Sequence, residues 1–157
     1  MNDINPESLA NLAIEALERT AFVVAELADE DFVDDLPSCE WYTRIQYTGP
    51  QCGAIYLAGS TGFLLELAAS LLGVDADSVQ AEQEGLDALH EMTNIVGGSV
   101  VTTIGGDHCE LSLGLPSRAE ASDIGDIAGM QRCILDAEGE RLEVTWAPVE
   151  QSESKAA

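Results

Sequence analysis

The sequence contains few positively charged residues. Its 157 residues include six Lys and Arg against 29 Asp and Glu, which gives a formal net charge of -23, and its one lysine, Lys155, lies in the C-terminal tail. Binding to nucleic acids and to anionic lipid depends on clustered Lys and Arg side chains. The composition therefore excludes both as expected partners. It favours high solubility or adaptation to a salty cell, with a dedicated basic partner as the alternative.

Paired cysteines and long apolar segments are also lacking. The four cysteines, Cys39, Cys52, Cys109 and Cys133, form no C-x-x-C pair, so neither a zinc knuckle nor a redox motif is indicated. No apolar run approaches the roughly 18 residues of a membrane span, and the polar, acidic start does not resemble a signal peptide. We therefore expect a soluble cytoplasmic protein with free, mostly buried thiols.

Several familiar motifs for catalysis and metal binding are missing. The sequence has no G-x-S-x-G, no phosphate-binding loop and no H-E-x-x-H. Its two histidines, His90 and His108, are too few to predict a metal site. The acidic segment 29–35 lacks the ligand spacing and central glycine of an EF-hand loop, so we expect a solvated loop there. We predict no metal and no cofactor bound by this chain.

The length suits one domain, which we expect to span residues 1–150, followed by a flexible tail at residues 151–157. Apolar residues at helical spacing, with suitable caps, predict three helices. In chain order these are residues 5–28, opened by Asn5-Pro6; residues 62–72, capped by Ser60 or Thr61 and closed by Gly73; and a long third helix capped by Asp77 or Ser78.

About five strands are predicted from runs of aromatic, β-branched and other apolar residues. They cover residues 39–47, 52–57, 109–115, 130–135 and 142–146, with a polar loop at 117–126. The first two and the last two are separated by short turn segments, which indicates hairpins. Such an order favours an α+β fold with a mostly antiparallel sheet over a doubly wound parallel sheet.

The third helix carries a polar stripe. At 100° per residue, Asp87, Glu91, Asn94 and Gly98 fall within an arc of about 60°. The opposite side is apolar: Leu89, Met92, Thr93, Val96 and Val100. Glu91 and Asn94 are one turn apart and point to the same region, and Gly98 leaves clearance for another backbone. The alternative is an ordinary solvated face, with the glycines packing against the sheet or ending the helix.

This stripe resembles the signature of the CheC/CheX/FliY family of chemotaxis phosphatases. That signature is an acidic residue or Ser, three residues, Glu, two residues, Asn and then a small-residue segment, here Asp87, Glu91, Asn94 and residues 95–99. CheC-type members carry it twice, whereas this chain has it once, which is the CheX-like pattern. Family members often have Gly-Asn where this chain has Gly98-Ser99. The resemblance implies a CheC-like α+β fold and a homodimer.

The resemblance also implies a partner and roles for the stripe. The substrate would be the phosphorylated aspartate of a CheY-type receiver, which brings its own Mg²⁺. Asn94 would orient the attacking water, Glu91 would pair with the receiver's active-site lysine, and Asp87 would be a peripheral contact. Gly98 would give clearance to the partner. Two other hypotheses stay open, namely a non-catalytic adaptor that binds a receiver and a purely structural dimeric module.

Overall fold

A computed structural model describes residues 4–106, 110–125 and 129–149. These residues form three α-helices and one seven-stranded sheet. The helices are α1 (Pro6–Ala21), α2 (Thr61–Leu72) and α3 (Leu86–Gly105). The strands are β1 (Glu26–Leu27), β2 (Trp41–Thr48), β3 (Cys52–Gly59), β4 (Ser112–Leu113), β5 (Ser117–Ala119), β6 (Gln131–Ala137) and β7 (Glu140–Val149). No helix in the described part of the chain is long and apolar enough to cross a membrane.

The sheet is built from two hairpins joined side by side. Its order is β1-β6-β7-β3-β2-β4, and β5 also pairs with β2, beyond β4 along the same edge. Every strand pair is antiparallel. The expected α+β fold with a mostly antiparallel sheet is therefore confirmed.

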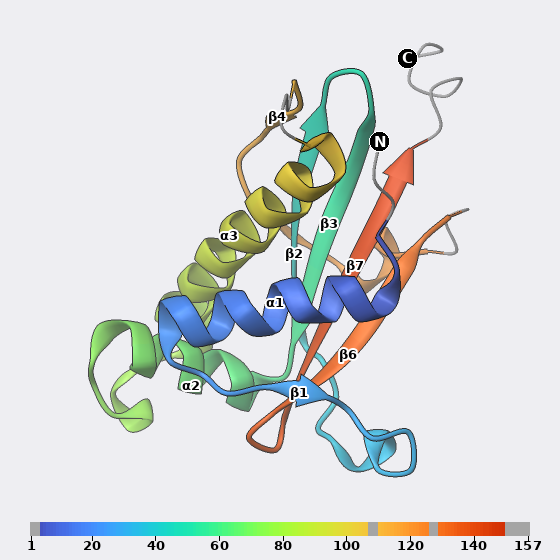
Figure 1. The fold of residues 1–157 in the computed structure, drawn as a ribbon. Coiled ribbons are helices and arrows are strands. Elements are labelled where there is room, and N and C mark those ends of the chain that lie inside the picture. Colours follow the sequence, from blue (N-terminus) through green and yellow to red (C-terminus); the bar gives the residue numbers. More distant parts are fainter. Residues whose placement is uncertain (1–3, 107–109, 126–128, 150–157) are drawn as a thin grey trace.

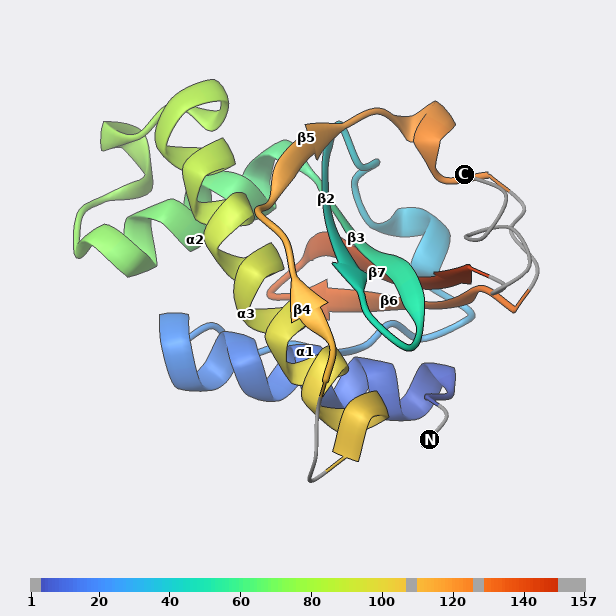
Figure 2. The same cartoon turned by 90° about the horizontal axis from the view of Figure 1, so that it is seen from above.

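All three helices lie on one face of the sheet (Figures 1 and 2). The strands alternate accordingly: in β3, Ile55 and Leu57 belong to the large core beneath the helices. Ala54 and Tyr56, from the same strand, belong to a second, smaller cluster on the opposite face. Since successive side chains of a strand point to opposite faces, one sheet supports both cores.

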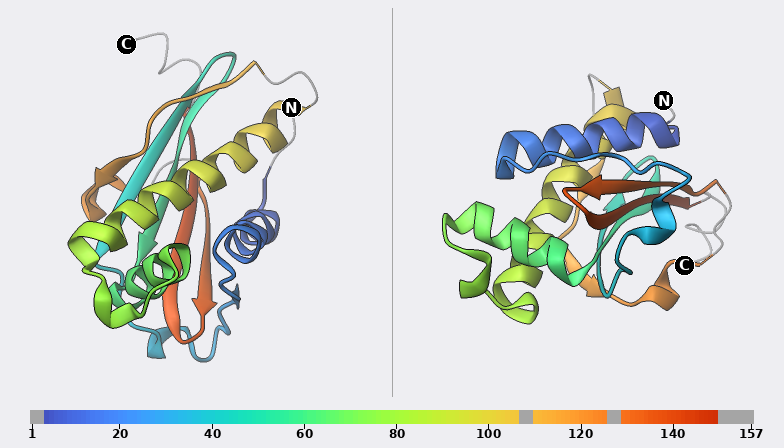
Figure 3. Two further views of the ribbon diagram at one scale, coloured as in Figure 1. Left: turned by 90° about the vertical axis from the view of Figure 1, so that its left-hand side faces the viewer. Right: turned by 90° about the horizontal axis from the view of Figure 1, so that it is seen from below.

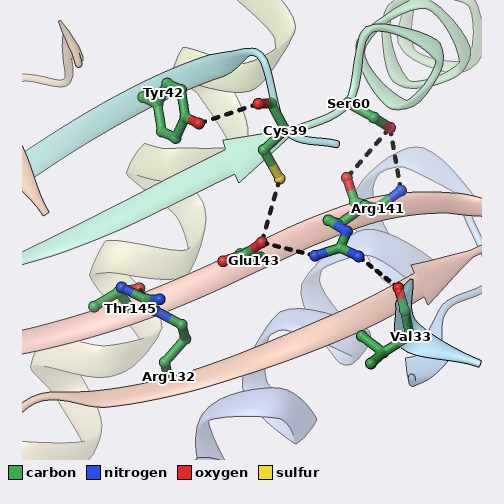
Figure 4. Close-up of polar contacts among 8 residues, drawn as sticks. All are labelled: Val33, Cys39, Tyr42, Ser60, Arg132, Arg141, Glu143 and Thr145. Carbon is green, nitrogen blue, oxygen red and sulfur yellow. Dashed lines mark hydrogen bonds and ion pairs between the residues drawn. The ribbon is translucent and has the colours of Figure 1, made fainter. Parts of the chain in front are cut away.

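The opposite face is closed by loop contacts around the β7 residue Arg141 (Figure 4). Its guanidinium donates to the Val33 carbonyl and pairs with the Glu143 carboxylate at 3.3 Å. The same carboxylate lies 3.7 Å from the Cys39 thiol. Burial, with the nearby Glu143 charge adding to it, raises the pKa of the Cys39 thiol to about 12. The thiol therefore stays protonated near neutral pH and joins residues 33–39 to the sheet.

The predicted hairpins and second helix are confirmed. The turn at residues 49–51 joins β2 to β3, and Glu138 and Gly139 turn the chain between β6 and β7 with positive φ angles. For α2, the Ser60 hydroxyl accepts from the Phe63 N–H and Gly73 ends the helix in the left-handed conformation. These elements depend on local turn and cap residues, which sequence patterns report directly.

Other boundaries differ from the sequence prediction. The first helix ends at Ala21, not near Ala28, because Phe22 adopts the left-handed conformation and its N–H bonds to the Leu17 carbonyl. The third helix does not begin after Asp77 or Ser78: a short 3₁₀ turn and a π-helical turn precede it.

The last differences concern strands. The strand expected at 109–115 is only Ser112–Leu113, and Cys109 lies outside the described residues, as do His108 and the tail from Glu150. The loop expected at 117–126 begins instead with β5, and β1 was not expected at all. Of the described cysteines, Cys39, Cys52 and Cys133 are free, with Cys133 buried and the other two half-buried. The acidic segment 29–35 is mostly exposed, as expected.

Helix α3 is fixed to β2 by two contacts of different kinds. The buried Thr93 hydroxyl donates to the Leu89 carbonyl one turn earlier and lies 2.6 Å from the Thr43 hydroxyl. One turn further along, Gly97 faces Ile45 so closely that a Cβ added to the glycine would lie 2.8 Å from the Ile45 Cγ2 atom. A buried hydrogen bond and a close approach together fix how α3 is rotated about its own axis.

The hydroxyl pair can be tested by a double-mutant cycle. We expect Thr43→Val and Thr93→Val each to lower the free energy of unfolding by about 1–3 kcal/mol, because each leaves a buried polar group with one partner fewer. The double variant should cost less than the sum of the two, by about 1 kcal/mol. Urea denaturation measures all four proteins, and strictly additive losses would show that the two hydroxyls do not interact.

The two neighbouring glycines make a matched pair. Replacing either with Ala removes the same helix-propensity penalty of about 1 kcal/mol. An added Cβ meets Ile45 at position 97 but nothing within 4 Å at position 98. We expect Gly97→Ala to be less stable than Gly98→Ala by about 1–3 kcal/mol, the usual cost of overpacking a core. Chemical denaturation measures this difference, and equal stabilities would mean that α3 does not approach β2 closely.

Candidate functional site

The candidate site is the outer side of α3. The helix follows directly from a π-helical turn at Ala81–Gly85, in which Gly85 is buried and an added Cβ would lie 3.1 Å from Leu64 Cβ. It then runs without a break through Gly97 and Gly98 to Gly105, and Gly106 ends it with a positive φ. The glycine pair therefore lies inside the helix and does not end it.

The polar stripe predicted by the angular analysis lies on the surface. Asp87, Glu91 and Asn94 are all exposed, and Gly98 has open space above it. The opposite, apolar stripe is fully in the core: Leu89, Met92, Thr93, Val96 and Val100 are each 0% exposed. The sheet holds the helix from behind, so its outer stripe projects into solvent.

Glu91 and Asn94 form the centre of this stripe. They are one turn apart, a rise of about 4.5 Å along the axis. Neither side chain has a hydrogen bond or ion pair to another of the described residues. A free carboxylate and a free amide, side by side on a rigid helix, are available to bind a partner.

Helix α2 borders the stripe on the Glu91 side. A cavity of about 140 Å³ lies between the two helices. Its lining comprises Ala68, Leu71, Leu72, Glu84, Asp87, Ala88 and Glu91. Leu72 is also largely exposed, at 59%. The stripe thus has an apolar margin on this side, next to its two carboxylates.

Strand β5 borders the stripe on the other side, where Arg118 lies. Figure 3 (left) shows α3 with the β4–β5 segment on one side and α1 and α2 on the other. The guanidinium of Arg118 stacks on the Trp41 ring, 5.3 Å from its centroid. The sequence analysis missed this residue because it placed 117–126 in a loop. The strand that holds Arg118 is only three residues long, too short to give a clear strand pattern in the sequence.

His90 lies between the stripe and Arg118. Its Nε2 atom is buried and has no hydrogen-bond partner among the described residues. Burial lowers the pKa of His90; Arg118 lowers it further, and the Asp87 carboxylate acts in the opposite direction. The neutral form of the imidazole is therefore favoured at neutral pH, so His90 adds little charge beside the stripe.

Within residues 4–106, 110–125 and 129–149, no three His, Cys, Asp or Glu side chains are placed to hold a metal ion. A larger hollow, about 440 Å³, lies elsewhere, between the start of α1, the segment after β1 and strand β6. The exposed pair is suited to entering another protein's pocket.

The sequence and the structure were compared with known proteins. The family model described as Chemotaxis phosphatase CheX matches residues 41–138, more than half of the chain and including the whole stripe. A search of curated proteins found no match.

Several solved structures share the fold. The chemotaxis protein CheX from Vibrio vulnificus has a TM-score of 0.72 at 14% identity, and the match covers 95% of this chain and 100% of that one. The CheX-CheY-BeF3-Mg²⁺ complex from Borrelia burgdorferi has a TM-score of 0.66 at 18% identity, covering 92% and 97%. A CheC-like superfamily protein from Shewanella has a TM-score of 0.62 at 19% identity, covering 93% and 99%.

At these identities the structural matches show a common fold, whereas the family match rests on the sequence itself. The signature residues lie within the matched range, on a helix whose outer side is exposed. The chain belongs to the CheX family of chemotaxis phosphatases.

Proposed function

We propose that this protein hydrolyses the aspartyl phosphate of a phosphorylated CheY-type receiver domain. The observation that carries the proposal is the free, exposed pair Glu91 and Asn94 on a helix fixed to the sheet from behind. Membership of the CheX family and a shared fold with a protein solved in complex with CheY support it. The homodimer that the resemblance implies stays a prediction.

Asn94 would act on water inside the receiver's pocket. An amide both donates and accepts hydrogen bonds, so it can orient a water molecule for in-line attack without taking its proton. The water oxygen bonds to phosphorus, the bond from phosphorus to the aspartate oxygen breaks, and aspartate leaves as a carboxylate. Both protons of the water stay with the phosphate, which is released as dihydrogen phosphate. An acyl phosphate is already reactive, so positioning supplies most of what is needed. The Mg²⁺ is expected in the receiver.

Glu91 would fix the orientation of the complex. A carboxylate that reaches the receiver's active-site lysine forms a charge-assisted hydrogen bond, which is stronger than a neutral one. With Glu91 held, Asn94 is aimed at one point of the pocket because both side chains project from the same helix. Asp87, one turn before Glu91, would be a peripheral contact, and Gly98 leaves room for the partner's backbone.

The proposal is tested by following loss of phosphate from a CheY-type receiver. We expect the wild type to accelerate it and Asn94→Ala to lose about 100-fold or more of that acceleration while still binding. Glu91→Ala should weaken binding by about 2 kcal/mol or more, because it leaves the receiver's lysine unpaired. Rapid-quench kinetics and calorimetry measure the two effects separately.

Matched controls exist on the other helices. Asn11 on α1 and Glu66 on α2 are exposed, and neither lines the cavity between α2 and α3, so Asn11→Ala and Glu66→Ala remove the same groups outside the stripe. Both should behave as the wild type. Binding of the receiver without any acceleration would favour the adaptor hypothesis. Full activity and affinity in Glu91→Ala would show that the stripe is not the binding site, under the phosphatase and the adaptor hypothesis alike.

The net charge of -23 predicts how salt affects association. Receivers are often acidic at their active sites, so two negatively charged proteins repel each other at long range. Raising the ionic strength from low values to about 0.1 M shortens the Debye length to about 10 Å and screens this repulsion. We expect the association rate, measured by stopped-flow, to rise over this range. A steep fall would contradict the expected charge relationship.

A further inference from the structure

Arg118 lies on the same side of the sheet as the polar stripe of α3. In the β2–β5 pair it is directly opposite Thr43, and directly opposite residues of an antiparallel pair point to the same face. The Thr43 hydroxyl contacts Thr93 of α3, so this face is the helix face. Arg118 therefore stands beside α3, on the flank where His90 is located.

The Arg118 side chain is held in place by an aromatic ring. Trp41, also on the helix face of β2, carries the guanidinium at 5.3 Å from its ring centroid, within the usual range of a cation–π contact. The indole is fixed in turn, because its Nε1 donates to the Thr61 hydroxyl at 3.0 Å, at the start of α2. The two contacts restrict the arginine before any partner arrives.

The charge of Arg118 is also available. The side chain is exposed, and among the described residues its guanidinium forms no ion pair. Arg19 and Arg141 pair with Glu15 and Glu143. Arg44 and Arg132 also form no ion pair among the described residues, but they lie opposite Tyr56 and Thr145, on the face of the sheet away from the helices. In a chain with six basic residues and 29 acidic ones, an unpaired arginine beside the functional stripe is a distinctive local feature.

The geometry points to Arg118, stacked on Trp41, as a second docking contact that binds a carboxylate on the rim of the partner's phosphorylated pocket. This inference rests on the proposed function, since it concerns the same partner and the same stripe. Arginine suits the role because its planar guanidinium can stack on a ring and still offer N–H groups to a carboxylate.

A carboxylate is favoured over the phosphoryl group for a geometric reason. Asn94 and Glu91 are at the centre of the stripe, whereas Arg118 is at its flank with His90 between. A partner that receives the central pair in its pocket presents its rim to the flank. The contact would also offset, at short range, the repulsion between two acidic proteins.

The test compares two substitutions that change the net charge equally. Arg118→Gln and Arg19→Gln each remove one positive charge, so they change the net charge equally, but Arg19 lies on α1 whereas the stripe lies on α3. We expect Arg118→Gln to weaken affinity for a CheY-type receiver about tenfold, for the unphosphorylated and phosphorylated forms alike, with kcat nearly unchanged. Arg19→Gln should have little effect. Arg118→Lys should recover only part of the affinity, because an ammonium does not stack as a guanidinium does.

A second measurement checks the placement of Arg118 without a partner. Arg118 lowers the pKa of His90, so the His90 pKa should rise in Arg118→Gln and stay unchanged in Arg19→Gln, as followed by NMR titration. Equal affinities for the two Gln variants would overturn the docking contact, as would a loss confined to the phosphorylated receiver. Neither result affects the phosphatase proposal, which fails only if the wild type does not accelerate loss of phosphate. If no receiver binds at all, both fail.

Discussion

The orientation of the polar stripe depends on how α3 is attached to β2. A helix packed on a sheet can rotate about its own axis unless a specific contact prevents it. Successive residues are about 100° apart around that axis, so a rotation of this size would bring a different set of side chains to the surface. The Thr43–Thr93 hydroxyl pair and the close approach of Gly97 to Ile45 prevent that rotation at two successive turns. Glu91 and Asn94 face solvent because Thr93 and Gly97 face the sheet.

Rigidity matters here because the proposed chemistry requires little else from this chain. Hydrolysis of an acyl phosphate by an oriented water needs an amide at the right point, and a misplacement of about 1 Å can cost about 100-fold in rate. A side chain on a packed helix is positioned more precisely than one on a loop. This protein and the proposed receiver are both acidic and repel each other at long range. They can bind only if attractive contacts at the stripe outweigh that repulsion. Arg118 is suited to supply such a contact.

The sequence predicted those parts of the structure that depend on neighbours along the chain. The two hairpins, the caps of α2 and the two stripes of α3 follow from turn residues, capping residues and periodicity. The end of α1 could not be predicted, because Phe22 is not a residue that usually adopts the left-handed conformation. Nor could β1 and β5, whose two or three residues are strands only because distant strands pair with them. Because β5 was not predicted, Arg118 was not included in the site predicted from the sequence.

The separation between the inner and outer sides of α3 has an evolutionary consequence. At the inner position 97 an added Cβ would meet Ile45, so a larger residue there costs packing energy, while at position 98 an added Cβ meets no atom within 4 Å, so a larger residue there does not disturb the packing of the helix on the sheet. Selection on partner choice and selection on folding therefore act on different residues of one helix. The outer surface of the helix can therefore change between proteins that keep this architecture.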